Sequence, residues 1–224
     1  MKINVKGTII SNDDKKVYEW FDMDSTCPRD IEEALDKAKK NEEIEVIINS
    51  GGGDVFVGSE IYSLLKDHKG KVTGKIVGLC ASAASVIAMG INNLKMSPTA
   101  QIMIHKASMV TGGNSEDFAK GAEILEGIDK SIANAYILKT GLKQDELLDM
   151  MSKETWLDAK TAKEKGFVDE IMFDEDNKIV ASFNSGVIPP QIINKLRNEF
   201  KEEKQINEKE LEIAKAKLNL QLNL

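Results

Sequence analysis

One serine and one histidine of this chain stand where a nucleophile and its base could meet. The apolar stretch 75–79 is typical of a buried strand, and it passes into the small residues Cys80 to Ser85 and then into an apolar helical segment. A strand that turns directly into a helix leaves unpaired N–H groups at the helix start. The hydroxyl of Ser82 would therefore lie beside a site for an oxyanion. Small residues can equally serve only to pack two backbones closely, so this run alone leaves both interpretations open.

His105 is the histidine that could activate this serine. Of the two histidines, His68 lies in a polar helix end and is expected to be solvated, whereas His105 follows the apolar pair Met103-Ile104. A serine hydroxyl is a poor nucleophile until an adjacent base removes its proton, and imidazole has the suitable pKa. A lone histidine is more often structural, but His105 together with Ser82 indicates nucleophilic catalysis.

A run of three glycines, 51–53, follows another predicted strand, 44–48. Glycine lets backbone amides approach a ligand or an anion closely, and open α/β folds place their sites at the ends of strands. A simple turn would need glycine as well. No Gly-Lys-Ser/Thr follows, so the run is not a phosphate-binding loop.

Strands and helices alternate along most of the chain, which predicts an α/β fold with mostly parallel pairing. Apolar runs predict strands at 2–10, 44–48, 72–79, 93–96, 101–104 and 167–173. Helical spacing of apolar residues predicts helices at 28–38, 57–65, 83–89, 143–151 and 159–165. The longest predicted helix begins with a capping pattern at Asn114-Ser115-Glu116 and continues for about six turns to Ala135.

Composition narrows the class of protein. The 224 residues carry a net charge of −7 and no basic cluster, which argues against a nucleic-acid partner. No stretch resembles a signal peptide or reaches the roughly 20 apolar residues of a membrane span. Two cysteines, Cys27 and Cys80, are too few for a disulfide scaffold and fit a reducing compartment. We therefore expect a cytoplasmic protein that makes no membrane contact.

The character of the chain changes at Val187. Pro189-Pro190 breaks regular structure, and a segment rich in Lys, Glu, Gln and Asn follows without a steady heptad. We expect a catalytic domain over 1–186 and a charged appendage over 187–224, helical or partly disordered, whose charges are solvated.

Four ordered motifs resemble those of the Clp protease proteolytic subunit family, and in particular its phage-encoded head-maturation (prohead) proteases. They are Ser50-Gly51-Gly52-Gly53-Asp54-Val55, Gly78-Leu79-Cys80-Ala81-Ser82, Met103-Ile104-His105, and Thr155-Trp156-Leu157-Asp158-Ala159 with Gly166-Phe167-Val168-Asp169. The resemblance covers about residues 1–175. It implies the α/β fold that this family shares with the crotonases, a spiral of ββα units, with a long handle helix at 118–136.

The resemblance also implies a role for each residue that falls on a family motif. Ser82 would be the nucleophile and His105 the general base, the N–H groups of Gly53 and Ala83 would form the oxyanion hole, and Gly52 and Val55 would contact substrate. The third catalytic member of the family is an aspartate two residues before an aromatic. Here the aromatic is Trp156 and the matching residue is Glu154, with Asp158 and Asp169 as alternatives. A glutamate can orient an imidazolium much as an aspartate does.

The same resemblance implies a serine endopeptidase without metal or organic cofactor. It further implies a homo-oligomeric ring, a heptamer or double heptamer, that cleaves phage scaffold or capsid proteins in the bacterial or infected-host cytoplasm. Two departures are visible. Gly51 stands where the family usually has proline, and the N-terminal segment does not resemble the axial loops that engage an AAA+ unfoldase. An ATPase partner is therefore only weakly indicated.

Other interpretations remain open from the sequence. Cys80 is two residues from Ser82, and a thiol is intrinsically the better nucleophile, but on a strand it is more often a small buried apolar residue. A crotonase-like acyl-CoA enzyme would also hold an oxyanion with two backbone amides, without needing Ser82 and His105 together. A third interpretation is a non-catalytic capsid-assembly protein that keeps the fold for its ring and uses its C-terminal segment as a scaffold.

Overall fold

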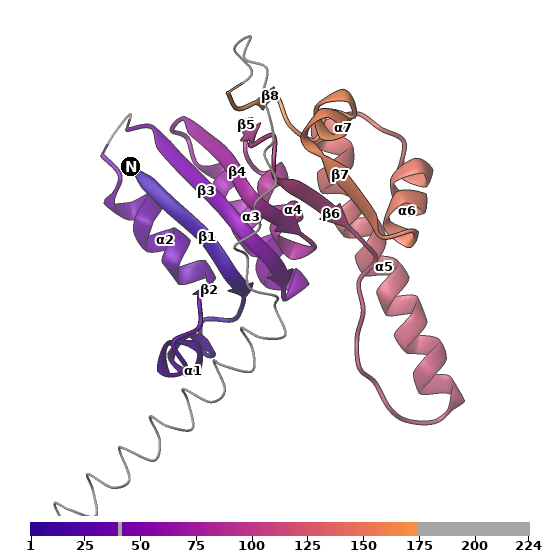
Figure 1. Cartoon of the computed structure of the whole chain (residues 1–224). Coiled ribbons are helices and arrows are strands. Elements are labelled where there is room, and N and C mark those ends of the chain that lie inside the picture. The colour runs from indigo at the N-terminus through magenta and orange to yellow at the C-terminus, as the bar shows by residue number, and fades with distance from the viewer. Residues whose placement is uncertain (40–41, 174–224) are drawn as a thin grey trace, which may run out of the picture. The chain divides into compact units, whose positions relative to one another are not determined.

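One sheet organises the computed structural model, which describes residues 1–39 and 42–173. Its main path runs β2 (Ser25–Thr26), β1 (Lys2–Ile9), β3 (Ile44–Gly53), β4 (Val72–Ala81), β5 (Asn93–Met96) and β8 (Glu170–Ile171). Off this path, β6 (Gln101–Ile104) pairs with β4, and β7 (Thr155–Asp158) pairs with β6 (Figure 1). Among the described strands all pairs are parallel except β6 with β7. The predicted α/β fold with mostly parallel pairing is confirmed.

Seven helices accompany the sheet within the described ranges. They are α1 (Lys15–Trp20), α2 (Pro28–Lys37), α3 (Val55–Asp67), α4 (Ala83–Met89), α5 (Ser115–Thr140), α6 (Gln144–Ser152) and α7 (Ala159–Glu164). Every residue of α4 is buried, and this helix contacts β3, α3 and α5. Except for Ser85 its side chains are apolar, and three of the seven residues are alanine, which suits a helix surrounded by the core.

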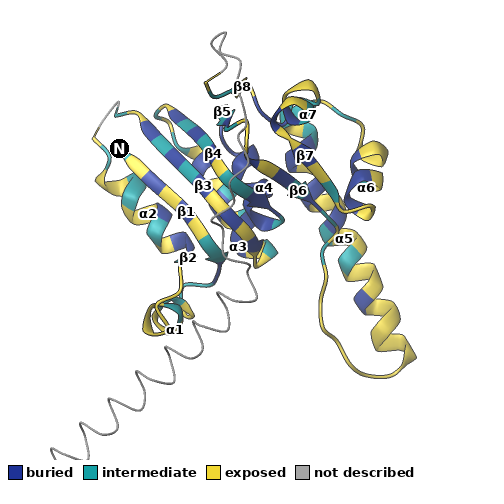
Figure 2. Cartoon of the chain, in the orientation of Figure 1, coloured by how far each residue is buried: buried dark blue, intermediate teal, exposed yellow. Residues whose placement is uncertain are grey.

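Helix α5 has two unlike halves. Asn114 caps it by accepting the N–H groups of Glu116 and Asp117, and Gly141 ends it in the left-handed conformation. The first half projects beyond the sheet (Figure 1) and is mostly exposed, whereas most of its buried residues fall between Asp129 and Tyr136 (Figure 2). The predicted long helix is confirmed and extends to Thr140.

Several boundaries differ from the sequence-based predictions. The predicted strands 44–48 and 72–79 are longer, so that the glycine run belongs to the end of β3. The predicted strand 167–173 is wrong over its first part. Phe167 and Val168 both donate their N–H groups to the carbonyl of Ala162, which closes the end of α7, and only Glu170–Ile171 forms a strand. The short elements α1, β2 and β7 were not predicted.

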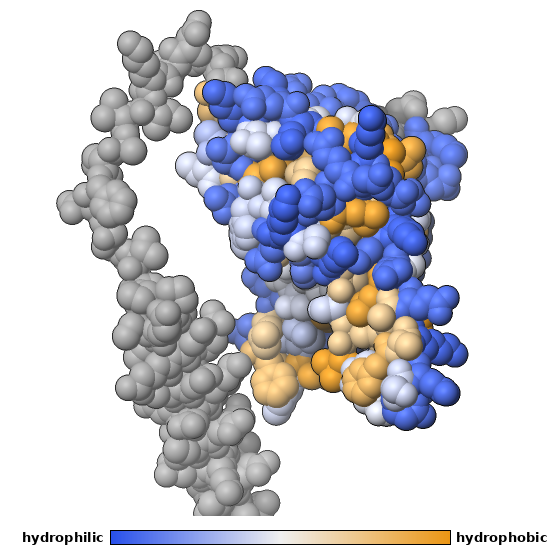
Figure 3. Space-filling model, turned by 90° about the vertical axis from the view of Figure 1, so that its right-hand side faces the viewer, coloured by the Kyte–Doolittle hydropathy of each residue, from blue (hydrophilic) through white to orange (hydrophobic). Residues whose placement is uncertain are grey.

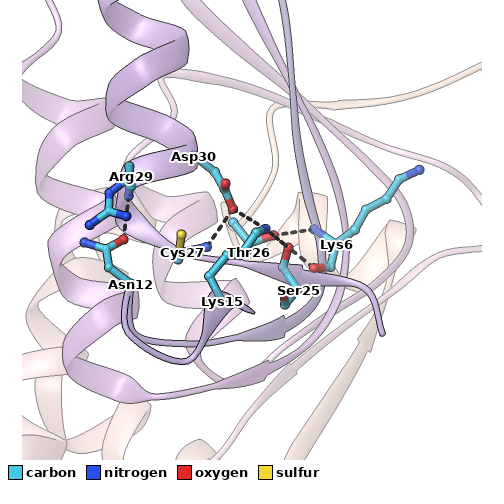
Figure 4. A network of polar contacts seen from close by, with 8 residues as sticks. All are labelled: Lys6, Asn12, Lys15, Ser25, Thr26, Cys27, Arg29 and Asp30. Carbon is cyan, nitrogen blue, oxygen red and sulfur yellow. Dashed lines mark hydrogen bonds and ion pairs between the residues drawn. The ribbon is translucent and has the colours of Figure 1, made fainter. Parts of the chain in front are cut away.

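A polar network fixes the segment between β1 and α2 (Figure 4). The carboxylate of Asp30 accepts the backbone N–H of Cys27 at 3.0 Å and the ammonium of Lys15 at 2.7 Å. Lys15 also donates to the carbonyl of Ser25 at 3.1 Å. Burial alone would raise the pKa of Asp30, but these hydrogen bonds outweigh it, and the pKa is lowered. The network attaches α1 to the start of α2 and to β2.

In the described part of the chain, no helix combines the length and apolarity that crossing a bilayer requires. The expected appendage 187–224, together with the end of the expected catalytic domain from residue 174, lies outside the described residues.

Candidate active site

Ser82 occupies the single residue between the end of β4 and the start of α4. Its backbone has φ 54° and ψ −128°, a left-handed conformation that side chains other than glycine rarely adopt. Hydrogen bonds on both sides hold it: the N–H donates to the carbonyl of Met103 at 2.9 Å, and the Ser82 carbonyl accepts the N–H of Ser85 at 2.9 Å. Strain of this kind persists only where the surroundings enforce it, and it is concentrated at functional turns.

The side chains of Ser82 and His105 are in direct contact. Serine Oγ lies 2.7 Å from imidazole Nε2. The register of the sheet brings them together, because Ala81 of β4 pairs with Met103 of β6 and each functional residue follows its strand closely. With the proton of the neutral ring on Nδ1, Nε2 accepts the serine proton. The pair is within reach of direct proton transfer.

Two glycines at the end of β3 lie where no side chain fits, Gly52 against the serine turn and Gly53 against β1. A Cβ built on Gly52, whose φ is 96°, would lie 2.6 Å from Cβ of Ser82 and 3.0 Å from the nitrogen of Ala83. At Gly53 a Cβ would overlap the carbonyl oxygen of Ile9. The absence of a side chain at Gly52 thus allows backbone from β3 to lie against the serine turn, and its absence at Gly53 allows β3 to lie close to β1.

A cavity of about 340 Å³ opens beside the pair. Gly53, Ser82, Ala83 and His105 all line it, together with Val55 from the start of α3. The N–H of Ala83 belongs to the first residue of α4, where the helix offers no acceptor of its own. The rest of the wall is mostly apolar and comes from Asp54 and Phe56 beside Val55, from α4, from residues 106–109 and from α5 between Ile124 and Tyr136. Gly52 supports Ser82 from behind and is not part of the cavity wall.

Glu154 lies on the turn between α6 and β7 and is exposed. Its φ is 50°, and its carboxylate accepts the indole N–H of Trp156 at 3.4 Å. Within residues 1–39 and 42–173, the bond to Ser82 is the one hydrogen bond of the His105 ring, so Glu154 and the imidazole are not joined.

The two alternative carboxylates have other partners. Asp158 caps α7 by accepting the N–H of Thr161 at 2.7 Å, which lowers the pKa of Asp158. Asp169 accepts the ammonium of Lys139 and the N–H of Leu94, each at 2.7 Å. Neither is bonded to His105 in the described structure.

Cys80 is fully buried behind the turn. Its thiol donates to the carbonyl of Ala84 at 3.4 Å, and burial raises the pKa of the thiol. A thiol that stays protonated and has no access to solvent is inert as a nucleophile. This geometry favours Ser82.

Three polar residues around the site were missed from the sequence. Ser85 Oγ lies 2.6 Å from the Ser82 carbonyl and 2.7 Å from the Tyr136 hydroxyl, and Asp129 accepts the N–H of Ala107 at 2.8 Å. Asp129 and Tyr136 are seven residues apart and so share one face of α5. Polar residues on the otherwise apolar, buried face of a predicted helix were the signal that could have found them.

Comparison with known proteins identifies relatives of this chain. The family model described as Clp protease matches residues 33–175. The ATP-dependent Clp protease proteolytic subunit of Deinococcus radiodurans is 30% identical over 140 residues, which is 62% of this chain and 69% of that subunit. The proteolytic subunit 1 of Chlamydia abortus is 30% identical over 144 residues, 62% of this chain and 74% of that subunit.

A solved structure shares the fold. A mutant of ClpP1 from Listeria monocytogenes superposes with a TM-score of 0.62 at 22% identity, covering 78% of this chain and 92% of that one. The matched residues 33–175 include β4, β6 and the turn before β7. These matches do not support the crotonase-like alternative. The chain belongs to the Clp protease family and is a serine endopeptidase.

Proposed function

We propose that Ser82 and His105 form the catalytic pair of this peptidase, and the 2.7 Å contact between Oγ and Nε2 is the observation that carries the proposal. Ser82 Oγ attacks the scissile carbonyl while His105 takes its proton, and the imidazolium then returns the proton to the leaving amine. The N–H groups of Ala83 and Gly53 stabilise the oxyanion. Water, deprotonated by His105, hydrolyses the acyl-enzyme and frees Ser82.

Glu154 is the proposed third member of this machinery. Its support is the antiparallel register of β6 and β7, in which Ile104 pairs with Thr155. Glu154 and His105 are each the next residue beyond this last pair of the ladder, so the register brings their backbones to the same end of the β6–β7 pair. A change of side-chain rotamer would then let the carboxylate accept the Nδ1 proton of the imidazole.

The cavity supports a preference for peptides with an apolar side chain next to the scissile bond. Its wall combines the backbone around Gly53 with apolar side chains such as Val55, Val86 and Ile128. Apolar walls with a few polar groups at one end are typical of sites that bind by burial and orient by hydrogen bonds.

The proposed biological role is phage head maturation in the bacterial cytoplasm, with scaffold or capsid proteins as substrates. Its support is the order and form of the four sequence motifs. The projecting, exposed half of α5 supports a homo-oligomeric ring, because a helix that leaves its own sheet can pack against a second subunit. Figure 3 shows hydrophobic residues gathered on the lower part of one face, at the level of this free end of α5.

The catalytic proposal is tested with Ser82→Ala. We expect the purified variant to lose casein hydrolysis and labelling by a fluorophosphonate probe. Cys80→Ala is the matched control, because the thiol is buried and inert, and it should keep both. Hydrolysis that survives in Ser82→Ala, or that a thiol reagent stops in folded wild type but not in Cys80→Ala, would contradict the serine assignment.

The head-maturation proposal needs a separate test. Coexpression with phage capsid or scaffold proteins should give shortened products with wild type and none with Ser82→Ala. If these proteins stay intact while casein is cleaved, the phage role is wrong and the peptidase assignment stands.

A further inference from the structure

A chain of buried hydroxyl groups connects helix α5 to the backbone of Ser82. Tyr136 is 1% exposed and Ser85 is fully buried. The phenol oxygen lies 2.7 Å from Ser85 Oγ, which lies 2.6 Å from the Ser82 carbonyl oxygen. Ser85 and Tyr136, which are 51 positions apart in sequence, are thereby joined by a hydrogen bond next to Ser82.

The donors in this chain can be assigned from proton counts. A carbonyl oxygen only accepts, so the single hydroxyl proton of Ser85 is committed to the Ser82 carbonyl. Ser85 Oγ must then accept in its other contact, and the phenol of Tyr136 is the donor. Burial raises the pKa of Tyr136, so the phenol keeps the proton that it donates. Successive donation in one direction polarises and strengthens each bond.

We propose that Tyr136 is a positioning residue for the nucleophile and acts through Ser85. The Ser82 carbonyl must be held by hydrogen-bond donors, because the backbone of Ser82 is in a strained, left-handed conformation. The Tyr136 proton fixes the Ser85 hydroxyl. That hydroxyl, at 2.6 Å, is a closer donor to the Ser82 carbonyl than the N–H groups of Ser85 at 2.9 Å and Val86 at 3.3 Å, and it restrains the rotation that would swing Ser82 Oγ away from His105. This inference rests on the proposed role of Ser82.

Packing alone is the competing explanation for Tyr136. Its ring also contacts Phe167, with centroids 5.8 Å apart, so the aromatic body fills the core irrespective of the hydroxyl. Tyr136→Phe keeps the ring and removes only the donor. Tyr62→Phe is the matched control, because the Tyr62 hydroxyl makes no hydrogen bond within the described part of the chain.

The experiment is a double-mutant cycle of Tyr136→Phe and Ser85→Ala in the full-length protein. A misplacement of about 1 Å can cost about 10²-fold in rate, so we expect the smaller shift in each single variant to lower kcat by about tenfold. KM for a peptide substrate should change less than about twofold, and fluorophosphonate labelling should slow by the same factor as kcat. Because both act through one contact, the double variant should be no slower than the slower single variant.

Each outcome decides the question. Full kcat and labelling in Tyr136→Phe, with Ser82→Ala inactive, overturns the inference and leaves the proposed function intact. Hydrolysis that survives in Ser82→Ala fails the proposed function itself. Additive losses in the double variant overturn the route through Ser85. If Tyr136→Phe does not fold, Ser85→Ala decides alone: unchanged kcat overturns the inference and a loss of about tenfold supports it.

Discussion

The proposed nucleophile–base pair and the proposed third catalytic residue are built in different ways. Ser82 and His105 follow two strands whose backbones are hydrogen-bonded to each other, and their side chains meet at 2.7 Å. Glu154 lies on an exposed turn, and its carboxylate is bonded to Trp156. Sheet register fixes the first two residues through the main chain. The third depends on the rotamer of a long side chain, whose freedom must be lost before it can orient an imidazole.

The largest difference between the two regions should appear when the base is removed. We expect His105→Gln to lower kcat by about 10⁴-fold or more, because a nucleophile without its base loses most of the catalytic machinery at once. His68→Gln is the matched control, since His68 ends α3 and lines a different cavity. The steady-state rates at which the two variants hydrolyse the same peptide are compared. Similar rates would refute the proposed role of His105 as the base.

A substitution at the glycines beside the serine turn should have the second-largest effect on kcat. Gly52→Ala places a methyl group against Ser82 and Ala83 at a positive φ, so we expect a fall in kcat of about 10²–10³-fold, the typical cost of one lost oxyanion donor. In Gly51→Ala the methyl group meets only a Leu79 methyl at 3.9 Å, and activity should be unchanged. Equal losses in both variants would show that the strand end is merely intolerant of side chains.

Glu154 should have a smaller effect than His105. We expect Glu154→Gln to lower kcat by about 10–10²-fold, because the third member of a triad contributes less than the other two and Glu154, the residue proposed for that role, is exposed. Glu32→Gln, at an exposed position of α2, should leave kcat unchanged. If Glu154→Gln lowered kcat as much as His105→Gln, the contrast between the two regions would be wrong, because Glu154 would then be held as rigidly as His105.

Asp30 contrasts with Glu154, because two hydrogen bonds hold its carboxylate in one position. We expect Asp30→Asn to leave kcat unchanged and to lower the free energy of unfolding by about 0.5–1 kcal/mol at neutral pH. The folded state lowers the pKa of Asp30, so its stabilisation is complete above the unfolded value of about 3.9 and is lost as the pH falls through the lower, folded value.

Urea unfolding of wild type and Asp30→Asn at neutral pH and near pH 3 measures this difference. The gap between the two proteins should narrow at the lower pH. A gap that stays constant across this range would show that the hydrogen bonds, and not the charge, provide the stabilisation.

Much of the site could be predicted because its signals are local. The change from an apolar strand to small residues indicated the turn at Ser82, and the apolar pair before His105 indicated a strand end beside it. Asn114 and the acids that follow it indicated the start of α5. These patterns depend on residues near one another in sequence, where periodicity and capping act.

The rest depends on tertiary pairing. Strand β7 has only four residues, and its antiparallel pairing with β6 is set by the sheet and not by its own composition. The contact of Ser85 with Tyr136 joins distant segments, and no local pattern reports it. The left-handed backbone of Ser82 is likewise imposed by its partners, since serine has no intrinsic preference for it.

The two buried cysteines allow local opening of the native protein to be measured at two places. Cys27 caps the start of α2 and Cys80 lies directly behind the serine turn, and both side chains are buried. A thiol-reactive dye can therefore modify each one only after its surroundings open, and the two modification rates measure separate opening free energies at the two places. Occupying the cavity with a peptide inhibitor should slow the modification of Cys80 and leave that of Cys27 unaffected.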